Sequence, residues 1–131
     1  IPIAGAEVLA KRPYSMAECI ASRVVDIVRA DVSWGGGVTA VMKSAHLADA
    51  FGVQCEIHTA IYHPLELVNL YCAAAIKNSE FFELLWPTDY FDFGLAQPLV
   101  IENGKAQLPQ GPGLGAELDW DLIEDATFDV L

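Results

Sequence analysis

One short apolar run ends on a carboxylate: Val24-Val25-Asp26-Ile27-Val28-Arg29-Ala30-Asp31. Its nearly continuous apolar character is typical of a parallel strand that is covered on both faces. A second run of the same kind follows a helical segment and ends on an imidazole: Val53-Gln54-Cys55-Glu56-Ile57-His58. Together they predict two parallel strands joined by a helical crossover, each with an ionisable residue at its carboxyl end.

The same pattern extends outward along the chain. An apolar run over residues 1–4 leads to Glu7, and another over residues 80–82 leads to Glu83. The four ionisable residues are separated by 24, 27 and 25 residues, close to the length of one strand–loop–helix–loop unit. This repeat predicts an α/β fold with about four parallel strands, whose carboxyl ends meet on one face as in (β/α)8 barrels.

Helices are expected between these strands, because apolar residues recur there at helical spacing. The predicted ranges are 15–23, 39–51 and 65–76, with Ser15 as the N-cap of the first helix. The final part of the chain differs. Asn103-Gly104 predicts a hairpin between residues 99–102 and 105–108. We therefore divide the chain into a βα unit, residues 1–98, and a hairpin with an acidic tail that packs back on it, residues 99–131.

The composition indicates a chain that is unusually apolar for its size. Of 131 residues 53% are hydrophobic, so part of the apolar surface is expected to be covered by something absent here. The chain opens on Ile1 without a signal-like start, which we interpret as a fragment that lacks its N-terminal part. The alternative is a complete apolar domain that forms a homo-oligomer.

Charge and cysteine content limit the partners that we expect. A net charge of −11 disfavours nucleic acid and anionic membranes, although a divalent cation can still bridge an acidic pocket to an anionic substrate. No apolar run approaches the roughly 18 residues of a membrane span. The cysteines are odd in number and lack zinc-site spacing, so Cys19, Cys55 and Cys72 are expected to be buried free thiols in a reducing cytoplasm.

Asp31 and His58 are the sharpest pair of candidate catalytic residues. They close adjacent predicted strands, so we expect their side chains to lie within hydrogen-bond distance. A carboxylate bonded to one imidazole nitrogen fixes the tautomer and leaves the other nitrogen to act as a general base or acid near neutral pH. The alternative is a loop aspartate that caps a turn and a histidine satisfied in the core.

Glu7 and Glu83 are the other candidates at strand ends. Glu7 is suited to ligate a hard cation such as magnesium, although one carboxylate is only part of such a site. The carboxyl group of Glu83 lies between two apolar residues, where it can stay protonated and donate a hydrogen bond to a substrate. The alternative for Glu7 is a solvated loop glutamate. The alternative for Glu83 is an ion-paired structural carboxylate. Four further residues are expected to shape the pocket: Trp34, Thr59, His63 and Trp86.

Several of these segments resemble the enolase superfamily, in its mandelate racemase and muconate lactonizing enzyme-like subgroup. The most specific are Asp31-Val32-Ser33-Trp34-Gly35-Gly36-Gly37-Val38-Thr39 and, after an alanine-rich helix, Cys55-Glu56-Ile57-His58. Pro2-Ile3-Ala4-Gly5-Ala6-Glu7 is similar to the segment with the third metal-binding carboxylate, and Pro112-Gly113-Leu114-Gly115 resembles the C-terminal signature. The resemblance implies the C-terminal half of a TIM (β/α)8-type barrel, followed by a hairpin and tail.

The resemblance also implies roles for the four strand-end residues. Glu7 would be a Mg²⁺ ligand, and Asp31 would orient His58 as the base or acid. Glu83 would bond to the substrate carboxylate as an enediolate forms. The other metal ligands, a lysine motif and the N-terminal capping domain have no counterpart here, so the metal site would be incomplete. The chain alone would then be inactive and bind magnesium weakly. The Gly-Glu that is common in the family at the third ligand is Ala6-Glu7 here.

By analogy, the expected activity is dehydration of an acid sugar by proton abstraction next to a carboxylate. A racemase or epimerase of 2-hydroxy acids is the alternative within enzymes. A cycloisomerase is less favoured, because such relatives resemble a lysine-based pattern. The expected partner is a small carboxylate or sugar-acid substrate. A non-catalytic fragment that assembles through open sheet edges is the alternative of a different class.

Overall fold

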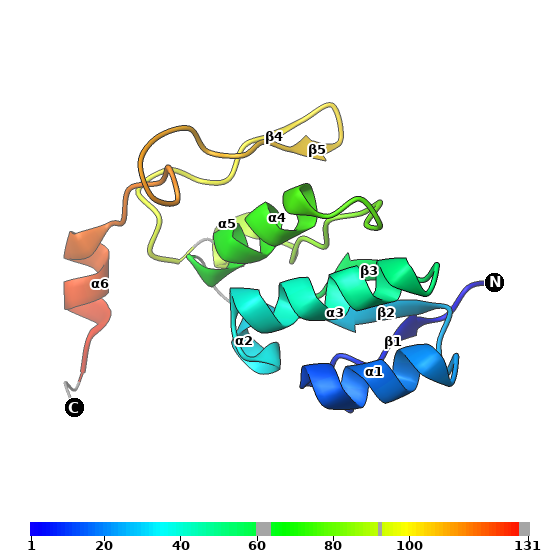
Figure 1. The fold of residues 1–131 in the computed structure, drawn as a ribbon. Coiled ribbons are helices and arrows are strands. Elements are labelled where there is room, and N and C mark those ends of the chain that lie inside the picture. The colour runs from blue at the N-terminus through cyan, green and yellow to red at the C-terminus, as the bar shows by residue number, and fades with distance from the viewer. Residues whose placement is uncertain (60–63, 92, 129–131) are drawn as a thin grey trace.

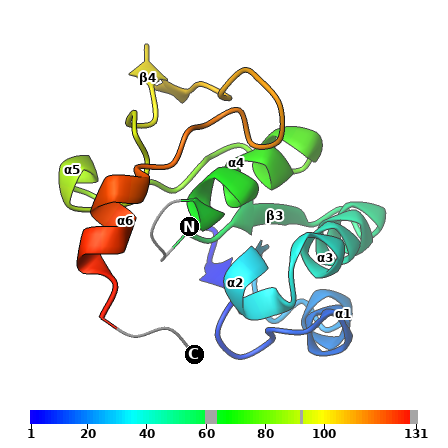
Figure 2. The same ribbon diagram turned by 90° about the vertical axis from the view of Figure 1, so that its left-hand side faces the viewer.

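The computed structural model describes residues 1–59, 64–91 and 93–128. Three short strands form a parallel sheet in the order β1-β2-β3: β1 (Ala4–Gly5), β2 (Ile27–Ala30) and β3 (Gln54–Ile57). Three longer helices alternate with them: α1 (Pro13–Ala21), α3 (Val38–Ala50) and α4 (Leu65–Ala75). These helices succeed one another along one side of the sheet (Figures 1 and 2). The predicted α/β class with parallel crossovers is confirmed.

The core lies between the sheet and these helices. Val28 and Ala30 on β2, and Cys55 and Ile57 on β3, alternate with less buried residues and pack in one cluster with α1 and α3. The opposite face of the sheet carries the intervening side chains, Arg29 among them, and is only partly buried. In the described part of the chain, therefore, only one face of these strands is fully covered. The polar positions of both strands lie together on the face that the helices leave uncovered.

The predicted fourth strand is reduced to a single bridge between Ile57 and Phe82. The carboxylate of Glu56 explains the difference, because it accepts hydrogen bonds from the backbone N–H groups of Glu80 at 3.0 Å and Phe81 at 3.1 Å. A side chain thus occupies donors that a regular strand would use for pairing. The prediction of about four strands is corrected to three strands and one bridge in the described part of the chain.

The first strand and the first helix also begin elsewhere than expected. β1 covers Ala4–Gly5 rather than residues 1–4, although Ile3 O accepts from Ile27 N at 3.1 Å. α1 starts at Pro13, a residue suited to the first helical position, so Ser15 is not the N-cap. Its hydroxyl instead donates to Arg12 O at 3.1 Å. The predicted starts of α3 and α4 agree with the structure to within one residue.

The expected hairpin is present as β4 (Ile101–Glu102) and β5 (Lys105–Ala106), which lie beyond α4 in Figure 1. Asn103 and Gly104 have φ values of +51° and +73°, as this two-residue turn requires. Three short helices were not predicted: α2 (Val32–Gly35), α5 (Thr88–Phe91) and α6 (Trp120–Ala126).

The acidic tail is tied to the βα unit in the segment that precedes α6. A bridge joins Leu95 and Leu118, and the Tyr71 hydroxyl lies 2.8 Å from Pro109 O. α6 itself has no buried residue, so the predicted packing of the tail does not extend to this helix in the described structure. No helix among the described residues combines the length and the apolar character that crossing a membrane requires.

Candidate active site

Asp31 is placed by the end of β2 and by a short helix that begins immediately after it. This helix, α2 (Val32–Gly35), lies where the sequence predicted only a loop. The Asp31 side chain is its N-cap and accepts from Ser33 N at 2.7 Å and from the Ser33 hydroxyl at 2.6 Å. Gly36 closes the turn at φ +104°, where glycine is favoured. Asp31 is therefore fixed, and only 2% of it is exposed.

His58 is brought to Asp31 by the register of the sheet. Ala30 pairs with Ile57, and His58 N donates to Ala30 O at 2.8 Å, so residues 31 and 58 emerge side by side. Nδ1 of His58 lies 2.9 Å from Oδ2 of Asp31. The prediction that these side chains lie within hydrogen-bond distance is confirmed.

The charge state of Asp31 decides which atom of this pair donates. Burial alone raises the pKa of Asp31, but hydrogen bonds from the Ser33 hydroxyl, His58 and the Ser33 amide outweigh it and leave the pKa below its usual value. Asp31 is therefore an acceptor at neutral pH, so we assign the proton between them to Nδ1 of His58. In neutral imidazole the second nitrogen, Nε2, then carries the lone pair.

Trp34, on α2, packs against His58. Their ring centroids are 5.0 Å apart at an interplanar angle of 38°, and Nζ of Lys11 lies 5.4 Å from the Trp34 ring centroid. Trp34 thus borders the site, as expected from the sequence. Of the other expected pocket residues, Trp86 is 81% exposed and His63 lies outside the described residues.

Glu83 joins the segment after α4 to both neighbouring strand ends. Its Oε2 accepts from Arg29 Nη2 at 2.5 Å and from Thr59 N at 2.8 Å. This arrangement corresponds to the ion-paired alternative rather than to a protonated donor in apolar surroundings. Glu83 is nonetheless connected to the Asp31–His58 pair, because Thr59 directly follows His58.

Glu7 lies on the turn after β1 and lines one small cavity together with Arg29 and Asp31. Its Oε2 is buried and has no hydrogen-bond partner among the described residues. Such an oxygen fits a ligand of a hard cation such as Mg²⁺. The described part of the chain contains no group of three acidic, histidine or cysteine side chains that can hold a metal, so Glu7 fits as one ligand of a larger set.

Two residues near the pair were missed at the sequence level. Arg29 is the cation of the Glu83 ion pair, and Asn69 on α4 bonds to backbone atoms beside both Asp31 and His58. Each is a polar residue in a mostly apolar element, and this is the signal that marks them, because a polar group that loses contact with water needs a partner.

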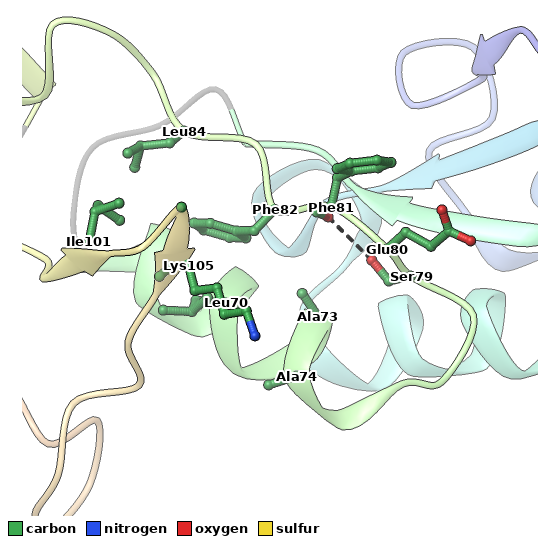
Figure 3. A pocket seen from close by; sticks show the side chains of 12 residues that line it. Leu70, Ala73, Ala74, Ser79, Glu80, Phe81, Phe82, Leu84, Ile101 and Lys105 are labelled. Carbon is green, nitrogen blue, oxygen red and sulfur yellow. Dashed lines mark hydrogen bonds between the residues drawn. The ribbon is translucent and has the colours of Figure 1, made fainter.

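Figure 3 shows a separate cavity of about 500 Å³ that is lined in part by Leu70, Phe82 and Lys105. Its walls come from α4, the segment around Phe82 and the β4–β5 hairpin, and they are mostly apolar. Neither Asp31 nor His58 lines it. We therefore place the candidate site at Asp31, His58 and the neighbouring carboxylates rather than in this cavity.

Ionisable side chains at the carboxyl ends of parallel strands are the arrangement found in the active sites of barrel-type domains. Residues 1–122 match the enolase C-terminal domain-like family, and the chain belongs to this family. The resemblance noted in the sequence is thereby confirmed, together with the half-barrel fold.

Individual relatives agree with this assignment. An arabinonate dehydratase from Saccharolobus solfataricus is 35% identical over 130 residues, covering 98% of this chain and 33% of the relative. A muconate cycloisomerase 1-2 from Acinetobacter lwoffii is 31% identical, covering 95% and 32% respectively. The crystal structure of a mandelate racemase/muconate lactonizing enzyme from Sulfitobacter sp. has a TM-score of 0.84 at 24% identity, covering 99% of this chain and 32% of that one, and shows the fold alone. The chain spans about a third of the length of these proteins.

Proposed function

We propose that this chain is the C-terminal catalytic part of an enzyme that removes the proton next to the carboxylate of an acid sugar. In this proposal His58 is the base, and Asp31 holds the imidazole in the tautomer that leaves Nε2 free. The observation that carries the proposal is the 2.9 Å contact between Nδ1 of His58 and the buried carboxylate of Asp31.

The proton that His58 takes is weakly acidic in water, so the negative charge that develops on the substrate must be stabilised. A bound Mg²⁺ would supply that stabilisation, and Glu7 is the residue of this chain that would hold it. Within the chain, Arg29 and the backbone N–H of Thr59 hold the carboxylate of Glu83 at the edge of the site. We assign Glu83 to the substrate-binding group, where Arg29 compensates its negative charge.

Dehydration completes the reaction when the hydroxyl on the neighbouring carbon leaves. His58, protonated by the first step, is placed to return that proton to the departing oxygen, so that water and an enol are formed. The enol then rearranges to a 2-keto-3-deoxy acid. The similarity to an arabinonate dehydratase supports this outcome over the others.

The alternatives differ in what happens to the proton. A racemase or epimerase returns a proton to the opposite face of the same carbon, which requires a second acid beyond the Asp31–His58 pair. Cycloisomerisation is a further alternative, because the chain is similar to a muconate cycloisomerase. The Asp31–His58 pair favours a histidine base and so disfavours this reaction, whose relatives resemble a lysine-based pattern. We also propose that the chain works within a longer polypeptide or a homo-oligomer in a reducing cytoplasm, because its free thiols and half-covered sheet suit both.

A screen of the complete protein against a library of sugar acids tests this proposal. We expect one or a few substrates to yield a 2-keto-3-deoxy acid, and His58→Asn to abolish its formation while circular dichroism shows an unchanged fold. Inversion at the carbon next to the carboxylate without loss of water would indicate the epimerase alternative. The non-catalytic alternative would be favoured by two results together: the 131-residue chain assembles, and the complete protein turns over none of the sugar acids.

A further inference from the structure

Asn69 lies near the middle of α4, and its side chain is completely buried. Its carboxamide binds two separate segments of backbone. Oδ1 accepts from the N–H of Val32 at 3.1 Å, and Nδ2 donates to the carbonyl of His58 at 3.1 Å. One planar group therefore spans the segment that follows Asp31 and the segment that carries His58.

The sheet alone does not fix the geometry of the Asp31–His58 pair. The last paired residues are Ala30 and Ile57, and both candidate residues lie one position further along. Asp31 then leads into α2, whereas the backbone of Thr59 turns to the carboxylate of Glu83. A side chain that bonds to both backbone segments at this point therefore controls the distance between the Asp31 and His58 side chains.

A carboxamide suits this place for a chemical reason. It carries a donor and an acceptor at a fixed separation, and its two partners determine its orientation because a backbone N–H only donates and a carbonyl only accepts. Burial makes both bonds costly to lose, since a backbone group left without a partner keeps its desolvation penalty.

We propose that Asn69 is a positioning residue that sets the contact between Asp31 and His58 by holding the backbone beside each of them. Its effect on turnover rests on the proposed function. Its effect on the geometry of the pair does not, and can be measured without a substrate.

The chain offers a matched control in Asn78. Its Nδ2 also donates to two backbone carbonyls, Ala45 O and Val53 O, each at 3.1 Å. Val53 precedes β3, so Asn78 braces the opposite end of this strand from His58. Asn69→Ala and Asn78→Ala each remove a carboxamide with two backbone partners, but only the first lies beside the pair.

The test has one arm without substrate and one with it. Proton NMR of the 131-residue chain follows the Nδ1-bound proton of His58, identified by its absence in His58→Asn. We expect Asn69→Ala to lose or shift this signal and Asn78→Ala to retain it. In the complete protein, kcat should fall by up to about 100-fold in Asn69→Ala with little change in KM, as misplacement of a catalytic group predicts.

Asn69→Asp provides a second variant if Asn69→Ala does not fold, because it keeps the acceptor for Val32 and loses the donor to His58. Circular dichroism establishes folding for each variant. A folded Asn69 variant with an unchanged His58 signal would overturn the proposal, as would equal loss of the signal in Asn78→Ala. A wild-type protein without turnover would overturn the proposed function instead, and the NMR arm would still decide this inference.

Discussion

Oδ2 of Asp31 lies 2.9 Å from Nδ1 of His58, while its other oxygen, Oδ1, accepts two hydrogen bonds from Ser33. Both carboxylate oxygens are thus engaged in a side chain that is almost fully buried. These bonds stabilise the charged form of Asp31 against the effect of burial, so its pKa is lower in the folded chain than in the unfolded one. The protonation of this residue is therefore linked to stability.

The linkage predicts how stability depends on pH. A carboxyl group with a lowered pKa stabilises the fold fully above its unfolded-state pKa of about 3.9, and this contribution is lost as the pH falls through the folded-state value. We expect Asp31→Asn to cost about 1–3 kcal/mol at pH 7 and less as the pH is lowered below about 4. Urea unfolding of both proteins at several pH values measures this. A difference between them that stays constant with pH would contradict it.

Ala6 has a φ of +82°, a backbone conformation that glycine adopts without strain and alanine does not. We expect Ala6→Gly to raise the free energy of unfolding by about 0.5–1 kcal/mol, because relief of strain exceeds the added entropy of the unfolded chain. Ala4→Gly, two residues earlier in β1, is the control and should destabilise. Thermal unfolding compares them, and a lower melting temperature for Ala6→Gly would refute the prediction.

The three thiols should differ in reactivity. Burial, with a smaller effect from Glu56, raises the pKa of Cys55 to about 12, and burial also raises the pKa of Cys72. Cys19 is only half-buried. Because the thiolate is the reactive form, we expect iodoacetamide to modify Cys19 first and the others only on unfolding. Mass spectrometry of the native protein identifies the labelled residue, and early labelling of Cys55 would contradict the packing described.

Magnesium should bind weakly to the 131-residue chain, because Glu7 is the one candidate ligand that we identify among its described residues. Glu7→Gln should weaken the binding further by removing the charge, and Glu18→Gln, on the exposed side of α1, should leave it unchanged. Isothermal titration calorimetry measures both. Tight binding that survives Glu7→Gln would show that another site holds the metal.

The central features of the site were predictable because they depend on local pattern. An apolar run that ends on an ionisable residue identifies a strand and its carboxyl end, and parallel pairing brings such ends together. Asp31 and His58 therefore met as predicted. α3 and α4 were also predictable from local pattern, because each is long enough to show apolar residues at helical spacing.

The features that were missed depend on contacts between residues far apart in the sequence. The carboxylate of Glu56 takes the backbone donors of the expected fourth strand, and nothing in the local pattern of residues 80–82 reveals this. Arg29 and Asn69 find partners 54 and 37 residues away. α2 spans four residues, too few for any periodicity to show.

Loss of the substrate's proton next to the carboxylate tests the central claim most directly. The complete protein is incubated with an acid-sugar substrate, and the NMR signal of this proton is followed over time for the wild type and for His58→Asn. We predict that the wild type removes this proton as the keto acid forms and that folded His58→Asn does so at least about 100-fold more slowly, because it lacks the base. Equal rates of loss in both proteins would contradict the role of His58 and with it the account of this site.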